Sequence, residues 1–202
     1  MKKLFTIDLK DYDPNGKRFY RPSVRGIIFD DKNNIAMIYS RKYHFYKFPG
    51  GGVEGDENHL KTLAREIKEE TGMTLIPDSI KEFGEVLKIQ KGDDLGEDTI
   101  HIQQNFYYIC KVEDKIEKPN LDEREKEADF VLKFVPVDEA IRVNTAFKGD
   151  DKFKKQMAER ERRVLEIIKN TYKTWWGRIV QVLTIYREGI RLKLANMNIY
   201  SK

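Results

Sequence analysis

The chain has 202 residues, a length typical of one domain or of one domain with an extension. Charged residues make up 36% of it and hydrophobic residues 40%, while 11% aromatic residues exclude a disordered chain. A single cysteine, Cys110, excludes an internal disulfide and favours a reducing compartment, so we expect a cytoplasmic protein. No apolar run approaches the length of about 18 residues that a membrane-spanning helix needs.

The charge of the chain is unevenly distributed. Residues 171–202 contain six basic residues and one acidic residue, which gives this segment a net charge of +5. Because the whole chain has a formal net charge of +4, residues 1–170 carry about −1. A nearly neutral main part excludes a broad basic surface for nucleic acid. Apolar residues at helical spacing between the basic ones predict a basic amphipathic extension over 171–202, following a domain over 1–170. We expect the extension to contact its own domain, a second subunit of a homodimer, or a membrane surface.

The first half of the chain predicts short strands followed by one helix. Residues 1–23 are polar and contain a turn at 13–16. Strands are predicted, in order, at 24–29, 35–40 and 46–48. Residues 58–71 have apolar residues at helical spacing, and Gly72 is a natural end for that helix. We expect its buried stripe to consist of Leu60, Leu63, Ala64 and Ile67.

The second half predicts longer strands and then helices. Residues 83–89 and 99–110 alternate between apolar and polar side chains, as strands do, and 130–135 reads as a further strand. Helices are predicted at 137–145 and 151–170, the second with inward residues that include Phe153. Strands, one helix, more strands and then helices indicate a mixed α/β or α+β domain.

Three glutamates after a glycine-rich loop form the strongest functional pattern. Glu66, Glu69 and Glu70 share one face of the predicted helix, and the like-charged pair one turn apart costs roughly 0.2–0.5 kcal/mol. Converging carboxylates provide the oxygen ligands that Mg²⁺ or Mn²⁺ prefers over zinc. A solvated acidic face paired with nearby lysines and arginine is the alternative interpretation of these three residues alone.

The wider pattern favours the metal site. Residues 51–73 resemble the Nudix box, G-x5-E-x7-R-E-U-x-E-E-x-G-U with U apolar, without a departure. The resemblance, extended by the strand order to about residues 20–170, implies an α/β/α sandwich with a mixed β-sheet. It also implies hydrolysis of a nucleoside diphosphate linked to another group X, with a nucleoside triphosphate as the default substrate. A catalytically silent nucleotide sensor or interaction module is the alternative, against which the intact glutamate set argues.

The resemblance also implies roles for single residues. Glu69 and Glu70 would be the main ligands of Mg²⁺ or Mn²⁺, and Glu66 would be a further ligand or would position the attacking water. Glu57 would assist by hydrogen bonding, and Arg65 would orient the carboxylates. The backbone of Gly50, Gly51 and Gly52 would form the bend and offer a carbonyl ligand.

Further site residues are predicted outside the box. In relatives an additional acidic ligand often precedes the last strand, which here gives Glu127 or Glu125, with an ordinary charged loop as the alternative. Arg25 would contact phosphate, or else be a solvent-facing strand residue. Asn144 would read a base edge, or else cap the end of a helix.

Overall fold

A computed structural model describes residues 1–92, 96 and 98–171. The chain divides into two compact units, Met1–Val164 and Leu165–Lys202. Of the second unit only residues 165–171 are described, and they continue a helix that begins at residue 152. The predicted extension over 171–202 therefore lies, apart from its first residue, outside the described part and stays a prediction. None of the helices in the described ranges is long and apolar enough to cross a membrane.

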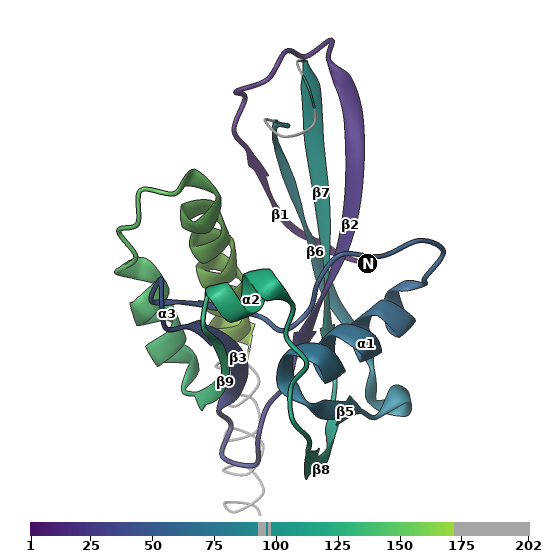
Figure 1. The fold of residues 1–202 in the computed structure, drawn as a ribbon, viewed down its shortest axis with the longest axis vertical. Helices are drawn as coiled ribbons and strands as arrows, with labels where there is room; N and C mark the ends of the chain where they lie inside the picture. The colour runs from purple at the N-terminus through teal and green to yellow at the C-terminus, as the bar shows by residue number, and fades with distance from the viewer. Residues whose placement is uncertain (93–95, 97, 172–202) are drawn as a thin grey trace, which may run out of the picture. The chain divides into compact units, whose positions relative to one another are not determined.

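A mixed four-stranded sheet organises the first unit (Figure 1). Its strands lie in the order β1 (Lys3–Asp8), β6 (Lys81–Lys91), β7 (Thr99–Ile109) and β2 (Lys17–Ile27). The outer pairs, β1 with β6 and β2 with β7, are parallel, and the central pair is antiparallel. This arrangement confirms the predicted α+β class with a mixed sheet.

Two small antiparallel groupings complete the strands. The first has the order β4 (Phe45–Lys47), β3 (Ile35–Ser40) and β9 (Phe130–Val135), and the second pairs β5 (Met73–Leu75) with β8 (Val112–Ile116). Short helices α2 (Glu123–Glu127) and α3 (Val137–Thr145) flank β9, and a 3-10 turn, Pro77–Ser79, precedes β6. β3, β9 and α3 have the bounds that the sequence predicts.

Local sequence explains where α1 (His59–Thr71) begins and ends. The side chain of Asn58 accepts hydrogen bonds from the backbone N–H groups of Leu60 and Lys61, at 3.1 and 3.0 Å, and so caps the first turn. Gly72 ends the helix with a φ of 73°, and a Cβ there would collide with the carbonyl oxygen of Glu117. Both ends agree with the prediction.

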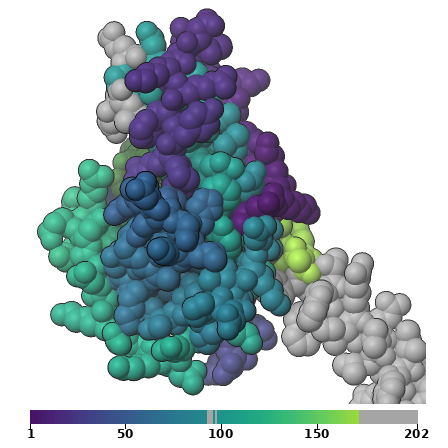
Figure 2. Space-filling model, turned by 90° about the vertical axis from the view of Figure 1, so that its right-hand side faces the viewer, coloured from purple at the N-terminus to yellow at the C-terminus, as the bar shows by residue number. Residues whose placement is uncertain are grey.

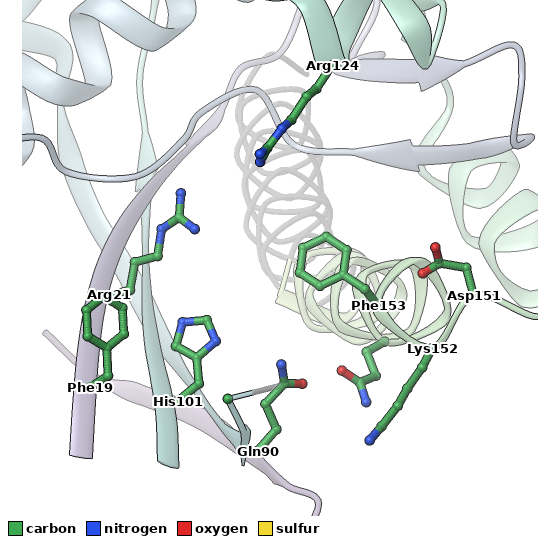
Figure 3. Close-up of a pocket in the computed structure, with 10 residues that line it drawn as sticks. Phe19, Arg21, Gln90, His101, Arg124, Asp151, Lys152 and Phe153 are labelled. Carbon is green, nitrogen blue, oxygen red and sulfur yellow. The ribbon is translucent and has the colours of Figure 1, made fainter. Parts of the chain in front are cut away.

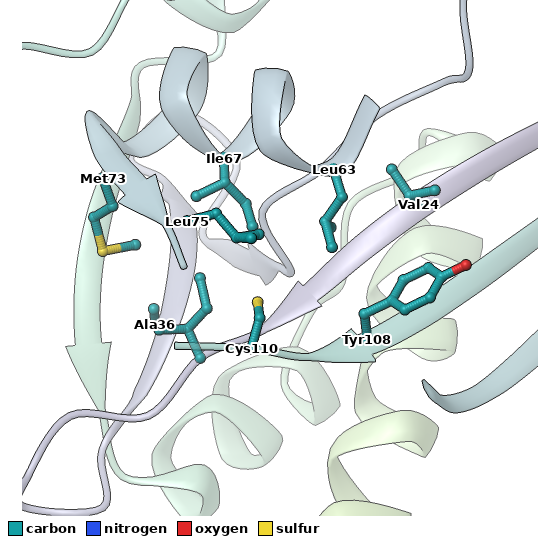
Figure 4. Packing of buried hydrophobic residues seen from close by; sticks show 9 residues of the cluster. Val24, Ala36, Leu63, Ile67, Met73, Leu75, Tyr108 and Cys110 are labelled. Carbon is teal, nitrogen blue, oxygen red and sulfur yellow. The ribbon is translucent and has the colours of Figure 1, made fainter. Parts of the chain in front are cut away.

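The buried face of α1 differs from the predicted stripe. Leu63 and Ile67 are fully buried in the core cluster with β2, β3, β5 and β7 (Figure 4), but Leu60 is 48% exposed and Ala64 is also exposed. The helix is rotated so that Glu70, rather than a further apolar residue, is buried. In the space-filling view of Figure 2, the region that contains α1, coloured blue, lies at the surface of the molecule.

Residues 152–164 cover the opposite face of the sheet through polar contacts. Arg160 donates from Nη1 to Oδ1 of Asn105 at 2.9 Å, and the Tyr107 hydroxyl donates to Glu161 Oε2 at 3.2 Å. All four residues are buried. With α1 on the other face, the first unit has the predicted α/β/α layering. Phe153, which the pattern placed inward, is 51% exposed.

The structure adds elements that the pattern did not predict. β1 lies where a polar segment was expected. It is an edge strand and is half-exposed, so its sequence lacks the clear alternation of a buried strand. β2 begins at Lys17, seven residues before the predicted start, because its first half is exposed and polar. β5, β8 and α2 are short elements of three to five residues, too short for a periodic signal.

Candidate functional site

Arg65 gathers three carboxylates of the box around one guanidinium. Its Nε and Nη2 donate to the two carboxylate oxygens of Glu57, each at 3.0 Å. Its Nη1 donates to Glu66 at 3.0 Å and to Glu69 at 3.1 Å. The planar fork of arginine makes this multiple contact feasible, because its donors are fixed in one plane. Hydrogen bonds from Arg65 lower the pKa of the Glu57 carboxyl, while burial raises that of Glu66.

Glu70 joins α1 to the glycine-rich loop. Its side chain is 1% exposed, its Oε2 accepts a hydrogen bond from the Gly50 N–H at 2.7 Å, and its Oε1 pairs with the ammonium group of Lys47. Gly50 has a φ of 131°, which side chains disfavour, and a Cβ there would meet the Val24 carbonyl. The buried carboxylate therefore fixes a bend that only glycine makes readily.

The glycine-rich loop also contacts Glu66 and Arg65. The Glu66 carboxylate occupies the space that a Cβ on Gly51 would take, so the loop backbone approaches the carboxylate closely. The Gly51 carbonyl accepts from the Val24 N–H at 2.9 Å, and the Gly52 carbonyl accepts from Arg65 Nη2 at 3.5 Å. The site therefore includes the backbone as well as the carboxylates.

Arg25 lies beneath the loop and not in solvent. It is 6% exposed, and its Nη1 donates to the Gly50 carbonyl. Burial lowers the pKa of its guanidinium, and the buried acids Glu161 and Glu70 oppose that shift. The alternative of a solvent-facing strand residue is thus wrong, and the observed role of Arg25 is to hold the loop.

The acidic segment before β9 brings Glu125 to the site. Glu125 Oε1 lies 3.9 Å from Lys47 Nζ, and its side chain is 17% exposed. Burial and a hydrogen bond with Glu70 raise the pKa of Glu125 to about 7. Glu127 instead pairs with Lys42 at 2.8 Å, with its side chain 70% exposed. Of the two predicted candidates, the structure therefore favours Glu125 over Glu127, because α2 turns the Glu127 side chain to the surface.

Two residues near the site have roles that sequence reasoning missed or misjudged. Lys47 was missed, although a lysine in a short apolar strand directly before the glycine-rich loop is a signal for a buried ion pair. Asn144 is 5% exposed, its Oδ1 accepts from the Tyr46 N–H at 2.8 Å, and its Nδ2 donates to the Tyr46 carbonyl at 2.9 Å. It therefore anchors β4 to α3, and it neither caps the helix nor is free to read a base.

The oxygen ligands that the cluster offers suit a divalent cation. Lys47, Arg65 and the buried Arg25 supply three positive charges at the cluster, whereas the cluster contains five carboxylates: Glu57, Glu66, Glu69, Glu70 and Glu125. An oxygen-only set with excess negative charge suits Mg²⁺ or Mn²⁺. Across the described ranges, no three His, Cys, Asp or Glu side chains already converge as a ready-made metal site. Lys47 and Arg65 hold the carboxylate oxygens here, so cation binding would require side-chain adjustment.

Comparison with known proteins identifies the family of the chain. The model of the NUDIX domain matches residues 19–158, which include the whole cluster. Among solved structures, a NUDIX hydrolase from Nitrosomonas europaea is similar at 19% identity and a TM-score of 0.48, covering 70% of this chain and 87% of that chain. The MutT protein from Bacillus halodurans is similar at 20% identity and a TM-score of 0.45, covering 61% and 72%. Because the family match spans more than half of the chain and the box residues meet in one cluster, the protein belongs to the NUDIX family, whose hydrolases cleave pyrophosphate linkages.

Proposed function

We propose that the protein is a Mg²⁺-dependent hydrolase that cleaves the pyrophosphate linkage of a nucleoside diphosphate joined to another group X. The observation that carries this proposal is the arrangement of two groups of carboxylates beside a bent glycine-rich loop. Glu57, Glu66 and Glu69 surround Arg65, and Glu70 and Glu125 lie at Lys47. Five carboxylates against the three cations Lys47, Arg65 and Arg25 would be a costly arrangement for stability alone, because like charges in a partly buried cluster repel. A bound divalent cation would offset this repulsion and would attract an anionic substrate.

Each residue has a distinct task in this proposal. Glu66, Glu69, Glu70 and Glu125 would hold the cation, which when bound neutralises phosphate oxygens and lowers the pKa of a water. Arg65 orients Glu66 and Glu69 through its fork, as partners behind metal ligands commonly do. Lys47 fixes the orientation of the Glu70 carboxylate. A carboxylate of this cluster would accept the proton of the attacking water. Burial raises the pKa of both Glu66 and Glu125, that of Glu125 to about 7, which suits this task near neutral pH.

A panel of nucleotides tests the proposal. Nucleoside triphosphates, nucleoside diphosphate sugars and dinucleoside polyphosphates are incubated with the full chain in Mg²⁺, and nucleoside monophosphate release is measured. We expect release from at least one class and none in excess EDTA. Full turnover in EDTA would refute the metal mechanism, and binding without turnover of any compound would favour the sensor alternative. Glu139→Gln is a matched control, since Glu139 lies on α3 and pairs with Arg142.

We also propose that the protein is cytoplasmic, because a chain with the single cysteine Cys110 fits a reducing compartment. Cys110 is buried, and burial raises the pKa of its thiol to about 12, so the thiol is unreactive.

A further inference from the structure

The helix over residues 152–164 has an open start and a buried middle. At its start, Lys152 and Phe153 border a cavity of about 640 Å³ beside β2 and β7 (Figure 3). About two turns later, Arg160 and Glu161 are only 3% and 0% exposed. Charged side chains are seldom fully buried unless they are paired, because their removal from water is costly. The burial of Arg160 and Glu161 therefore depends on partners within the fold.

Two buried donors hold the carboxylate of Glu161. Its Oε1 pairs with Nη2 of the neighbouring Arg160, and its Oε2 accepts a hydrogen bond from the Tyr107 hydroxyl at 3.2 Å. Burial and the charge of Glu161 raise the pKa of that hydroxyl, so it stays protonated and donates. Arg160 also donates from Nη1 to Oδ1 of Asn105 at 2.9 Å. The Glu161 carboxylate therefore has a fixed position against β7.

Arg25 lies next to this buried pair on the same face of the sheet. In the strand register, Arg25 of β2 is directly opposite Tyr107 of β7, so both side chains leave the sheet on one side. The positive charge of Arg160 repels the Arg25 guanidinium, and the negative charge of Glu161 attracts it. Arg25 Nε is buried and has no hydrogen-bond partner among the described residues. The balance of these two charges therefore contributes to holding Arg25 in place.

The peptide of Gly50 connects Arg25 to Glu70. Its carbonyl accepts a hydrogen bond from Arg25 Nη1, and its N–H donates to Glu70 Oε2 at 2.7 Å. Gly50 has a φ of 131°, in a region where glycine backbone moves readily, so contacts on both sides are needed to fix the bend. A shift of the Arg25 guanidinium would therefore move the Gly50 peptide and, with it, the Glu70 carboxylate.

We propose that Glu161 is a positioning residue for the metal site, because its charge holds Arg25 at the Gly50 carbonyl against repulsion from Arg160. The inference rests on the proposed function for the role of Glu70 as a metal ligand, and it gives helix 152–164 a task in the reaction. Without the charge of Glu161, Arg25 would be displaced from Arg160 toward Glu70 and would compete with the cation. The alternative is that Arg160 and Glu161 only attach the helix to β7.

Three variants distinguish positioning from simple attachment. Glu161→Gln keeps the shape and removes the charge, so Mg²⁺ affinity should fall about 10–100-fold, as for other residues that orient metal ligands. Arg160→Gln removes the repulsion, so Mg²⁺ affinity should not fall, although the lost hydrogen bond to Asn105 should lower stability toward urea. The double variant Arg160→Gln/Glu161→Gln removes both charges and should restore the affinity. Attachment alone predicts that the double variant is affected at least as strongly as either single variant.

Two measurements on the full chain compare these variants. Calorimetric titration gives the Mg²⁺ affinity, and hydrogen exchange with mass spectrometry on the metal-free chain reports on the loop that contains Gly50. In Glu161→Gln this loop should exchange about tenfold faster, as expected for the loss of one charge-assisted contact. Glu159→Gln is the matched control, because Glu159 lies on the same helix, pairs with Arg162 and is 47% exposed.

Hydrogen exchange separates this inference from the proposed function, since it needs neither metal nor substrate. Faster exchange of the loop in Glu161→Gln, reversed in the double variant, supports the positioning role even if the natural sequence hydrolyses no nucleotide. Unchanged exchange and Mg²⁺ affinity in a folded Glu161→Gln would overturn it and leave the hydrolase proposal intact. Equal losses in Glu161→Gln and in the double variant would overturn it as well.

The test also works if Glu161→Gln does not fold. Arg160→Gln and the double variant then decide, because neither leaves two buried arginines without an acid between them. Natural loop protection with lower stability toward urea in both variants supports the positioning role. A loop that exchanges about tenfold faster in either variant would overturn it, since attachment of the helix would then be sufficient to explain the effect.

Discussion

Replacing Arg65 by lysine tests whether one guanidinium organises the carboxylate cluster. Lysine keeps the positive charge, but a single ammonium group cannot reach Glu57, Glu66 and Glu69 together, so at least two carboxylates lose a donor. A hydrogen bond to a charged group contributes about 1.5–3 kcal/mol when buried. The Arg65 side chain is 26% exposed, so solvent screening reduces this contribution, and we expect a loss of about 1–3 kcal/mol in the free energy of unfolding.

The same substitution should affect metal-dependent activity more than stability. Residues that orient metal ligands typically change affinity or activity by about 10–100-fold when replaced. Urea denaturation gives the change in unfolding free energy, and turnover measured over a Mg²⁺ titration gives the apparent metal affinity. We expect Arg65→Lys to need a higher Mg²⁺ concentration and to turn over more slowly.

Arg142→Lys is the matched control for this experiment. Arg142 also makes a forked contact, with both oxygens of Glu139 at 2.7 and 2.8 Å, but its side chain is 69% exposed on α3. Exposed pairs contribute about 0–1 kcal/mol, so the control should change little. If Arg65→Lys behaved like Arg142→Lys, with the same stability and Mg²⁺ dependence as the natural sequence, the organising role of Arg65 would be refuted.

Three further substitutions test the surrounding fold. Gly72→Ala should destabilise the protein by more than about 1 kcal/mol, because alanine disfavours a φ of 73° and its Cβ would meet a carbonyl; unchanged urea denaturation would contradict this. Ile67→Ala should cost about 2–5 kcal/mol by the same assay, since Ile67 is fully buried, and a loss below about 1 kcal/mol would argue against the core described. Burial lowers the pKa of Lys88 to about 8 from 10.5, so the unfolded chain binds more protons between these values and stability should rise with pH across that window. Lys88→Met should therefore stabilise the protein near pH 7 and flatten this pH dependence, and an unchanged pH profile would show that Lys88 is not the cause.

Local signals explain which parts of the site could be predicted. The start of α1 at Asn58 and its end at Gly72 depend on residues within the helix and its caps, so the sequence alone reveals them. The spacing of Glu66, Glu69 and Glu70 likewise fixes their common face without any tertiary contact. These features agree with the structure because short-range geometry determines them.

Long-range packing explains what could not be predicted. The rotation of α1, which exposes Leu60 and buries Glu70, follows from the ion pair with Lys47, and Lys47 lies 23 residues earlier in the chain. The choice between Glu125 and Glu127 depends on how α2 sits against the site, which no local pattern encodes. Phe153 fits an apolar stripe but lines a cavity, because polar residues of the sheet face it.

Direct measurement of Mn²⁺ binding tests the central claim, that the glutamates of α1 form a metal site. Electron paramagnetic resonance counts free Mn²⁺ during a titration of the full chain and of Glu70→Gln, with Glu139→Gln as the control and circular dichroism to verify folding. We predict that Mg²⁺ competes for a Mn²⁺ site present in the natural sequence and in the control, and that affinity falls at least about tenfold in a folded Glu70→Gln. Equal Mn²⁺ affinity in all three proteins, or no binding by the natural sequence, would contradict the claim.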